Sequence, residues 1–382
     1  MDSFGEKEDS TVQKTVLNSV HQDLGARLVE FGGFEMPVWY STLTDEHHTV
    51  RKSAGLFDLC HMGRYEITGD NAVAAVDSVV TNHVAKMKTG QIRYSLVLNE
   101  QGGVRDDILI YRLPDRVWLV VNAGNREKLL GWFGDHLTRP GMEFRDRSEE
   151  VAMIALQGPT AESLLAPHVK TTWVKDLPSL GYYKISDLQL EIGGCSSTGW
   201  VSRTGYTGED GFELYVPSDE ACDVWNALAS TLGDAVKPCG LGCRDTLRLE
   251  AGMPLYGHEL DEETDPLSAG LDFGVRMKKP NGFIGHEALA KIQADGPTRR
   301  LQGFVVEGKR PARQGCAVFA GDREVGVVTS GSPSPTLEVP IACAYVASDV
   351  PLGTALEVDI RGTRAPLRPV DLPFYKRPKT PQ

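Results

Sequence analysis

The chain has 382 residues, of which 41% are hydrophobic, and its 52 acidic and 40 basic side chains give a formal net charge of −12. This length and hydrophobic content predict two or three globular domains. The acidic balance argues against nucleic-acid binding, which draws on clustered Lys and Arg, and no apolar run is long enough to span a bilayer.

The N-terminal segment and the cysteines indicate the compartment. Met1–Ser10 is polar and acidic, so it is typical neither of a secretory signal nor of an Arg-rich transit peptide. Seven scattered cysteines suit reduced thiols in a cytoplasmic enzyme better than a disulfide framework. Cys239 and Cys243 have no second cysteine pair or His cluster nearby, so the sequence predicts no metal site.

The first sixty residues predict two helices around an aromatic segment. Apolar positions recur at helical spacing over residues 12–29. The Gly- and aromatic-rich stretch 31–40 is interpreted as a loop, either one that walls a flat ligand or a packed surface loop. A second helix is expected to begin near residue 44, with Thr44 or Asp45 as its cap.

The next block mixes strands with helices and lacks a Gly-rich phosphate loop, so it predicts an α+β sheet domain that does not bind nucleotides. The expected strands are residues 64–68, 94–98, 108–111 and 118–122, and the expected helices are residues 72–80 and 125–136.

Two adjacent carboxylates in this block, Asp106 and Asp107, lie between the turn at Gly102-Gly103 and an apolar strand. Alternation along an extended segment sends them to opposite faces, so at most one points into any given site. A carboxylate that faces a core must find partners or raise its pKa. Spacing alone leaves equally open that both lie in water at the strand end or cap the turn.

The second half predicts a further mixed block and then a β-rich one. Residues 151–159 predict a buried strand that runs into a helix capped by Thr160, and a Gly-rich turn leads into a strand bearing Glu213. A charged helix within residues 238–252 is typical of a solvated surface. From about residue 300, short strands predict a small barrel or sandwich over residues 301–306, 317–319, 324–329, 341–345 and 356–360.

Taken together, several stretches resemble the aminomethyltransferase, or T-protein, family of the glycine cleavage system. The resemblance runs in the family's order from about residue 15 to the C-terminus. Its main segments are Gly55–Asp58, His61–Gly63, Arg93–Ser95, Asn99–Gly103 with the two aspartates, Ala155–Pro159, Gly205–Glu213, Gly242–Gly252, Phe283–His286 and Leu372–Arg377.

The resemblance implies an α+β protein built as a three-domain cloverleaf around a central folate channel, with a small C-terminal domain that resembles a β-barrel. The implied domains are residues 11–58 with 151–275, residues 59–150, and residues 276–382. Such enzymes take the aminomethyl carbon from the dihydrolipoyl arm of H-protein, release ammonia and form 5,10-methylenetetrahydrofolate. Tetrahydrofolate is then the co-substrate, lipoylated H-protein the partner, and a monomer the expected state.

The resemblance also implies the site. Its catalytic carboxylate falls on Asp107, which would stabilise the iminium-like carbon formed when the thiol departs. The implied folate contacts are Tyr94, Asn122, Tyr206, Glu213, Arg244, Tyr375 and Arg377. Glu213 offers an acceptor pair for a pterin edge, tyrosines offer aromatic walls, and Arg244 offers a planar fork. Arg244, Lys376 and Arg377 are the expected cations for the anionic tail.

Cys60 and Arg105 depart from the family pattern. Cys60 next to His61 raises a nucleophile hypothesis, but we expect a small packing residue, since the chemistry requires no enzyme-bound thioester. Arg105, where the family has an aliphatic residue, is expected to point away from the catalytic side. The alternatives are another folate-dependent demethylase of the same fold and a non-catalytic folate-binding relative that assists iron–sulfur assembly.

Overall fold

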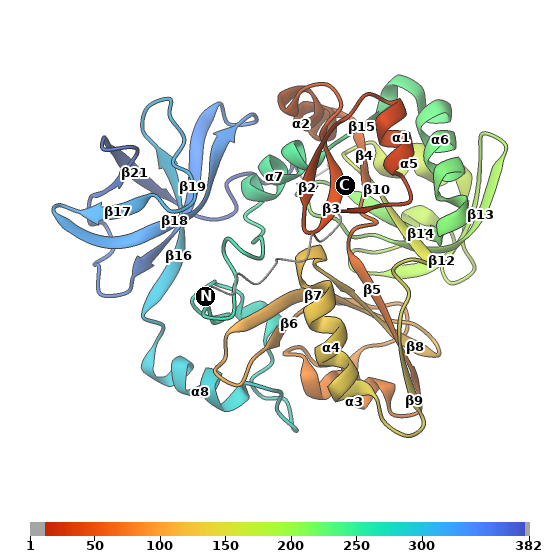
Figure 1. The fold of residues 1–382 in the computed structure, drawn as a ribbon, viewed down its shortest axis with the longest axis horizontal. Helices are drawn as coiled ribbons and strands as arrows, with labels where there is room; N and C mark the ends of the chain where they lie inside the picture. Colours follow the sequence, from red (N-terminus) through yellow and green to blue (C-terminus); the bar gives the residue numbers. More distant parts are fainter. Residues whose placement is uncertain (1–11, 379–382) are drawn as a thin grey trace, which may run out of the picture.

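A computed structural model describes residues 12–378 as a mixed α+β protein with three lobes in a cloverleaf arrangement (Figure 1). Met1–Ser10, in which we expect no targeting signal, lies outside the described residues, as do residues 379–382. No helix within the described range is long and apolar enough to cross a membrane.

The first lobe contains a seven-stranded sheet in the order β11-β12-β13-β14-β10-β4-β15. The interior strand β10 pairs antiparallel with both β4 and β14, and β15 runs parallel to β4. Alternate residues of β10 face opposite ways: Ile154 packs with Trp225 of α6, and Met153 packs toward the second lobe. The elements are β4 (Ala54–Asp58), β10 (Val151–Gln157), α5 (Ala161–Leu165), β11 (Val169–Lys170), β12 (Ile185–Ile192), β13 (Cys195–Ser202), β14 (Gly211–Pro217), α6 (Ala221–Leu232) and β15 (Val236–Pro238).

The second lobe is a five-stranded sheet in the order β6-β7-β8-β5-β9, with α3 and α4 on one face. Its other face carries Tyr111 and Trp118 into a core shared with the first lobe. The expected strands and helices of this block are confirmed. They are β5 (Gly63–Gly69), α3 (Ala72–Val79), β6 (Ile92–Leu98), β7 (Val104–Arg112), β8 (Arg116–Val121) and α4 (Arg126–Leu137). The edge strand β9 (Met142–Asp146) was not anticipated from the sequence.

The hairpin between β6 and β7 turns where expected, at Gly102-Gly103. Asn99 Oδ1 accepts a hydrogen bond from the backbone N–H of Gly103 at 2.8 Å. A Cβ at Gly103 would lie 1.8 Å from the carbonyl oxygen of Glu262, so only glycine allows this approach. The register shifts after the turn and leaves Arg105 as the extra residue of a bulge.

The N-terminal region differs from the sequence-based expectation. The helix expected over residues 12–29 is only α1 (Asn18–Asp23), because β1 (Gln13–Lys14) and β2 (Arg27–Phe31) flank it. Stretch 31–40 is not a loop, since β3 (Phe34–Trp39) pairs with both of these strands in a small sheet. Helix α2 (Leu43–Lys52) is capped by Thr42, whose hydroxyl accepts from the backbone N–H of Asp45, and not by Thr44 or Asp45.

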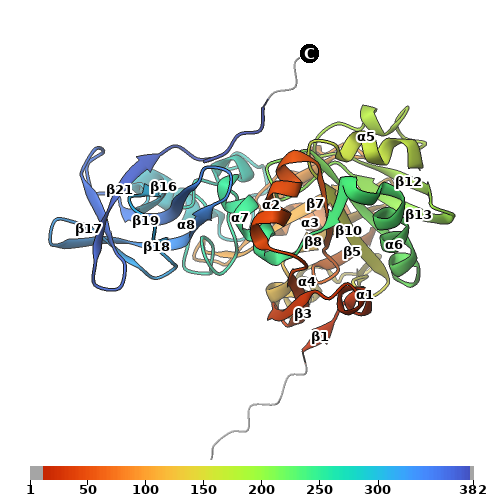
Figure 2. The same cartoon turned by 90° about the horizontal axis from the view of Figure 1, so that it is seen from above.

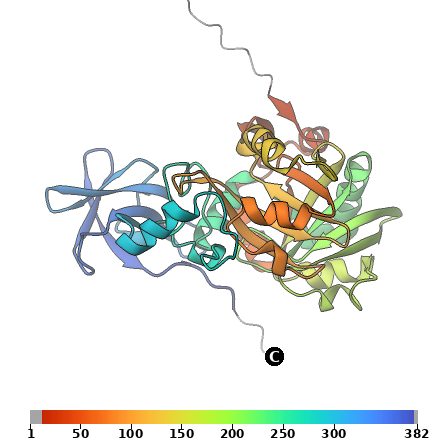
Figure 3. The same ribbon diagram turned by 90° about the horizontal axis from the view of Figure 1, so that it is seen from below.

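The C-terminal lobe is a closed barrel in the order β16-β19-β18-β17-β20-β21, which decides between the barrel and the sandwich. Figure 2 and Figure 3 show this barrel standing apart at one end of the molecule. Helix α8 and strand β21 were not anticipated from the sequence. The elements are α8 (His286–Asp295), β16 (Arg299–Val306), β17 (Ala317–Ala320), β18 (Arg323–Ser334), β19 (Val339–Ala347), β20 (Leu356–Asp359) and β21 (Arg364–Val370).

Helix α7 (Leu241–Glu250) joins the first lobe to the barrel, and the expectation that its charges are solvated was wrong. Arg248 is buried and donates to Glu259 Oε2 at 2.9 Å and to Ser330 Oγ at 2.8 Å. Glu250 is buried too, and it pairs with Arg51 Nη2 at 2.8 Å. The helix packs between the first lobe and the barrel. Its buried charges are therefore paired with charged and polar side chains of both lobes.

Candidate active site

A cavity of about 540 Å³ lies between the first and second lobes and the connecting segment that leads to the barrel. Of the predicted site residues, six line it: Tyr94, Asp107, Asn122, Tyr206, Glu213 and Arg244. Aromatic and aliphatic side chains form much of the remaining wall, which is typical of pockets that bind flat organic ligands. These further residues include Phe31, His61, Met62, Leu109, Val120, Met153, Tyr183, Leu255, Tyr256, Leu271 and Phe273.

The two adjacent carboxylates occupy different positions on this wall. Asp107 lines the cavity and Asp106 does not, as the alternation along the strand predicted. Asn122 lies between them, and its side-chain Nδ2 donates at 2.8 Å to Oδ1 of each carboxylate. Asp106 also accepts from the backbone N–H of Asn122 at 3.0 Å and from Asn125 Nδ2 at 2.6 Å. Neither carboxylate caps the turn, so that reading is wrong.

Burial sets the protonation behaviour of this pair. Removal from water raises the pKa of Asp106, and the neighbouring Asp107 raises it further. Burial likewise raises the pKa of Asp107, while hydrogen bonds from Tyr94 and Asn122 oppose the rise. The pair therefore exchanges its protons closer to neutral pH than ordinary aspartates do.

Tyr94 connects the carboxylate to the aromatic part of the cavity. Its hydroxyl donates to Asp107 Oδ2 at 3.1 Å. Its ring stacks on Phe273 with centroids 5.5 Å apart and an interplanar angle of 25°. Since Phe273 is 58% exposed, this stack marks the boundary between the cavity and solvent.

Glu213 and Arg244 place opposite charges on the first-lobe side of the cavity. Glu213 Oε2 accepts from Thr204 Oγ1 and, at 3.3 Å, from the Tyr215 hydroxyl, whereas no described residue donates to its Oε1. The Arg244 guanidinium lies over the Tyr206 ring at 4.8 Å, and no described residue accepts a hydrogen bond from it. One carboxylate oxygen and a guanidinium fork therefore remain available to a ligand.

Two of the predicted folate contacts do not lie on the cavity wall. The Tyr375 ring lies beneath the Arg51 guanidinium, at 4.0 Å. The Arg377 guanidinium lies over the Tyr182 ring at 4.6 Å and 4.0 Å from Asp210 Oδ1. Both belong to the tail segment after the barrel, and Lys376 between them does not line the cavity either.

The structure adds cavity residues that the residue patterns did not single out as contacts. His61 is buried, and its Nδ1 has no hydrogen-bond partner among the residues that the structure describes. Burial lowers its pKa to about 3, so its ring is neutral. A single His beside an apolar strand gives no chemical signal, although His61 falls within a segment of the family resemblance. Phe273 and Tyr256 lie on the connecting segment, where no regular period marks them.

The two departures next to the site are accounted for by their contacts. Cys60 is buried, its thiol donates to the Met153 carbonyl at 3.5 Å, and burial raises its pKa well above the usual range. It is therefore a packing residue. Arg105 points away from the cavity, as expected: its Nη1 lies 3.7 Å from Glu262 Oε2, and its guanidinium lies 6.0 Å from the Trp132 ring centroid.

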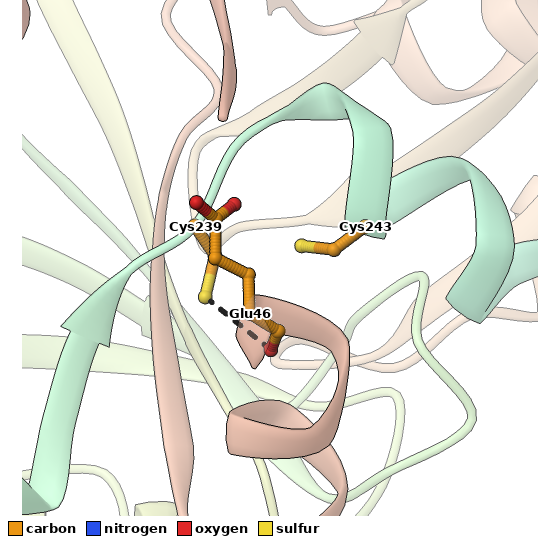
Figure 4. A group of neighbouring side chains, drawn as sticks. All are labelled: Glu46, Cys239 and Cys243. Atoms are coloured by element: carbon orange, nitrogen blue, oxygen red, sulfur yellow. Dashed lines mark hydrogen bonds between the residues drawn. The ribbon is translucent and has the colours of Figure 1, made fainter. Parts of the chain in front are cut away.

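Cys239 and Cys243 come together with Glu46 in the first lobe, with their potential ligand atoms within 4.8 Å of one another (Figure 4). The Glu46 carboxylate already accepts from the backbone N–H groups of Tyr40, Ser41 and Gly240 at 2.6, 2.9 and 2.8 Å. The Cys243 thiol donates to the Gly240 carbonyl at 3.3 Å, and burial raises its pKa. Among the described residues, this group holds chain segments in place.

Family models match nearly the whole chain. The GCVT N-terminal domain matches residues 17–279, and the glycine cleavage T-protein C-terminal barrel domain matches residues 299–376. The second match coincides with the closed barrel, and the first contains every residue of the cavity wall.

Individual relatives agree with these matches. The chain is 47% identical to an aminomethyltransferase of Symbiobacterium thermophilum, covering 97% of this chain and 99% of the relative. It is 45% identical to one of Cutibacterium acnes, covering 96% and 100%. Among solved structures, it is similar to the glycine cleavage system aminomethyltransferase T from Bartonella henselae, with a TM-score of 0.86, 32% identity and coverage of 96% and 98%.

Proposed function

The chain belongs to the glycine cleavage T-protein family and is an aminomethyltransferase, and on that premise we propose that its cavity binds tetrahydrofolate as co-substrate and that Asp107 is the catalytic carboxylate. The observation that carries this proposal is the placement of Asp107 on the wall of a largely apolar cavity, held by Tyr94 and Asn122. We further propose that lipoylated H-protein delivers the aminomethyl group.

The donors and acceptors left free in the cavity fit a pterin. A pterin edge presents an amide-like N–H and an amino group next to a carbonyl oxygen. Glu213 Oε1 is free to accept from such donors, and Arg244 is free to donate to the carbonyl. Tyr206 and Tyr94 offer aromatic surface to the ring system and to the benzoyl group that follows it.

Asp107 acts through its fixed charge. Positive charge develops on the aminomethyl carbon as the thiol leaves, and an anionic carboxylate in a site that excludes water stabilises that charge. The hydrogen bonds from Tyr94 and Asn122 keep the carboxylate in one orientation, so no reorganisation is needed during the reaction. Tetrahydrofolate, when bound, supplies the nitrogen nucleophile that accepts the carbon.

His61 and Asn125 support the site in other ways. A neutral His61 offers polar contact without adding a cation near the developing positive charge. Asn125 Nδ2 donates to Asp106 Oδ1 at 2.6 Å, and this bond keeps the Asp106 carboxylate off the cavity wall that Asp107 lines.

The expected division into three domains is retained as part of the proposal. The seven-stranded sheet takes its strands from residues 54–58 and 151–238, and the five-stranded sheet takes its strands from residues 63–146. These ranges support boundaries at about 58/59 and 150/151, with residues 276–382 carrying the barrel.

We also propose a monomer in the cytoplasm. The folate-dependent demethylase and the iron–sulfur-assembly relative are not favoured by any particular feature of the cavity.

Two measurements test the proposal. Titration with tetrahydrofolate, followed by protein fluorescence, should show saturable binding that weakens in Glu213→Gln. Ammonia release from aminomethylated H-protein should depend on added tetrahydrofolate. Folate binding without ammonia release would indicate the non-catalytic relative, and the absence of folate binding would refute the assignment of the cavity.

A further inference from the structure

Tyr256 lies on the connecting segment and lines the cavity, and the proposed reaction leaves its hydroxyl unused. The hydroxyl oxygen accepts a hydrogen bond from Lys128 Nζ at 2.9 Å, and the same ammonium lies 4.7 Å from the centroid of the Tyr256 ring. No described residue accepts a hydrogen bond from this hydroxyl. Its proton is therefore available to a ligand in the cavity.

Lys128 joins Tyr256 to the strand that carries Asp107. Besides the Tyr256 hydroxyl, its ammonium donates to the Arg105 backbone carbonyl at 2.8 Å and to Glu262 Oε1 at 3.0 Å. These acceptors use all three donors of the ammonium group. Since Arg105 is the bulge residue two positions before Asp107, one side chain fixes the Tyr256 hydroxyl relative to the strand of the catalytic carboxylate.

Backbone contacts hold the connecting segment against the same hairpin. The N–H of Val104 donates to the carbonyl oxygens of Asp261 and Thr264, both at 3.0 Å. Asn99 Nδ2 donates to the carbonyl oxygen of Glu262 at 2.9 Å. The segment that bears Tyr256 and the hairpin that bears the two aspartates are therefore packed as one unit.

The surroundings of Tyr256 favour a protonated hydroxyl that donates strongly. Burial raises the pKa of Tyr256, and the charges of Glu262 and Asp106 raise it further. The hydroxyl therefore keeps its proton at neutral pH. The Lys128 ammonium, which donates to the same oxygen, polarises the O–H bond and strengthens it as a donor.

The other hydroxyl groups of the cavity are less suited to meet a ligand beside Asp107. Three of them already donate within the protein, namely those of Tyr94, Thr204 and Tyr206. The Tyr183 hydroxyl has no described partner, but burial and the charge of Glu213 raise the pKa of Tyr183. Tyr183 therefore lies on the side of the cavity proposed for the pterin, whereas Tyr256 lies on the side of the aspartates.

We propose that Tyr256 donates a hydrogen bond to the departing sulfur of the dihydrolipoyl arm, and that Lys128 is the positioning residue that holds its hydroxyl. This inference rests on the proposed function of the cavity. As the S–C bond breaks, its electron pair passes to sulfur. The folate nitrogen forms the new N–C bond and releases a proton, which neutralises the thiolate. Tyr256 stabilises the negative charge at one end of the breaking bond, and Asp107 stabilises the positive charge at the other.

A contact with the folate is the other role that a free hydroxyl would suit. The polar edge of the pterin is matched by Glu213 and Arg244, which belong to the first lobe and to α7. Tyr256 is instead bonded, through Lys128, to the lobe that carries Asp107. Its anchor therefore favours the breaking bond over the pterin.

The test measures the rate at which free thiol appears in a single turnover of aminomethylated H-protein with saturating tetrahydrofolate. Tyr256→Phe keeps the ring and removes the hydroxyl, so this rate should fall about 10- to 100-fold, while the dissociation constant of tetrahydrofolate stays unchanged. Lys128→Met should slow the same step about three- to tenfold. Because Lys128 acts through Tyr256, the double variant should stay within about twofold of Tyr256→Phe alone.

Lys88→Met and Tyr182→Phe are the matched controls, because both residues are exposed and neither lines the cavity. Both variants should release thiol at the wild-type rate. The Lys128 side chain is 30% exposed, so Lys128→Met should keep the wild-type urea midpoint within the range of the controls.

A wild-type rate of thiol release in Tyr256→Phe would overturn the inference. Weaker tetrahydrofolate binding with an unchanged rate at saturation would also overturn it, since Tyr256 would then contact the folate. Additive losses in the double variant would refute the positioning role of Lys128. Failure of the wild-type chain to bind tetrahydrofolate would instead refute the function proposed for the cavity.

Discussion

Replacing Asp107 by Asn tests the central role of the carboxylate while leaving its shape intact. The amide oxygen can still accept from Asn122 Nδ2, and the amide nitrogen can donate to the Tyr94 hydroxyl oxygen. The charge alone is lost. At an effective dielectric constant of about 20, a carboxylate stabilises a unit positive charge about 4 Å away by about 4 kcal/mol. This corresponds to about a thousandfold in rate.

The same variant should not lose stability. Because the pKa values of Asp106 and Asp107 are raised in the folded chain, stability falls as the pH rises through these values. Asp107→Asn removes one of the two charges, so its urea midpoint should change less between pH 6 and pH 9 than that of the wild-type chain. Asp115→Asn is the control, since Asp115 is an exposed carboxylate paired with Arg116 at 2.7 Å in the same lobe.

The assay is tetrahydrofolate-dependent ammonia release from aminomethylated H-protein, with kcat and KM measured separately. The loss should appear in kcat for Asp107→Asn, and Asp115→Asn should match the wild-type chain. Near-normal kcat in a correctly folded Asp107→Asn protein would refute the catalytic role given to this carboxylate.

Three further predictions follow from the contacts of single residues. Asn122→Ala removes a hydrogen-bond donor from each carboxylate of the pair, so the pKa of Asp107 should rise. The acidic limb of the kcat–pH profile should then move to higher pH. An unmoved limb would show that protonation of the pair does not limit the rate. Glu213→Gln should weaken tetrahydrofolate binding about 10- to 100-fold by titration, because a charge-assisted hydrogen bond contributes about 1.5–3 kcal/mol, and a change below twofold would contradict the contact. Burial raises the pKa of Glu250, but the hydrogen bonds to Glu250 prevail and lower this pKa to about 2. The contribution of the Glu250 carboxylate to stability is therefore lost as the pH falls from about 4.5 toward 2. Glu250→Gln should cost about 3–5 kcal/mol in urea unfolding, whereas Glu149→Gln at an exposed pair should cost little.

The position of Asp107 illustrates what the sequence can predict. Alternation along a strand placed the two aspartates on different faces, and the resemblance to a family chose between them. Asp107 lines the cavity and Asp106 does not, as the alternation predicts, while the catalytic role of Asp107 stays a prediction. Neither predicted that one amide, Asn122 Nδ2, would bond to both carboxylates. That contact depends on how β8 ends beside β7, and a bulge at Arg105 adjusts the local geometry.

Contacts between lobes account for most of what the sequence did not predict. Arg248 and Glu250 have the composition of a solvated helix, and only the position of the barrel shows that they are buried. Phe273 lies on an irregular connector, so no period could assign it to the cavity. Tyr375 and Arg377 were predicted as folate contacts through the resemblance alone, and both lie on the tail segment, off the cavity wall.

The strand order of the first lobe also constrains how the chain folds as it is synthesised. Strand β4 has both of its neighbours, β10 and β15, far along the chain, because residues 59–150 intervene. Strand β4 must therefore wait with both edges unpaired while the second lobe, whose strands are nearer to one another in sequence, can already assemble. Slow release of residues 151–238 would prolong the exposure of an apolar strand, so aggregation during synthesis should depend on the rate at which this later segment emerges.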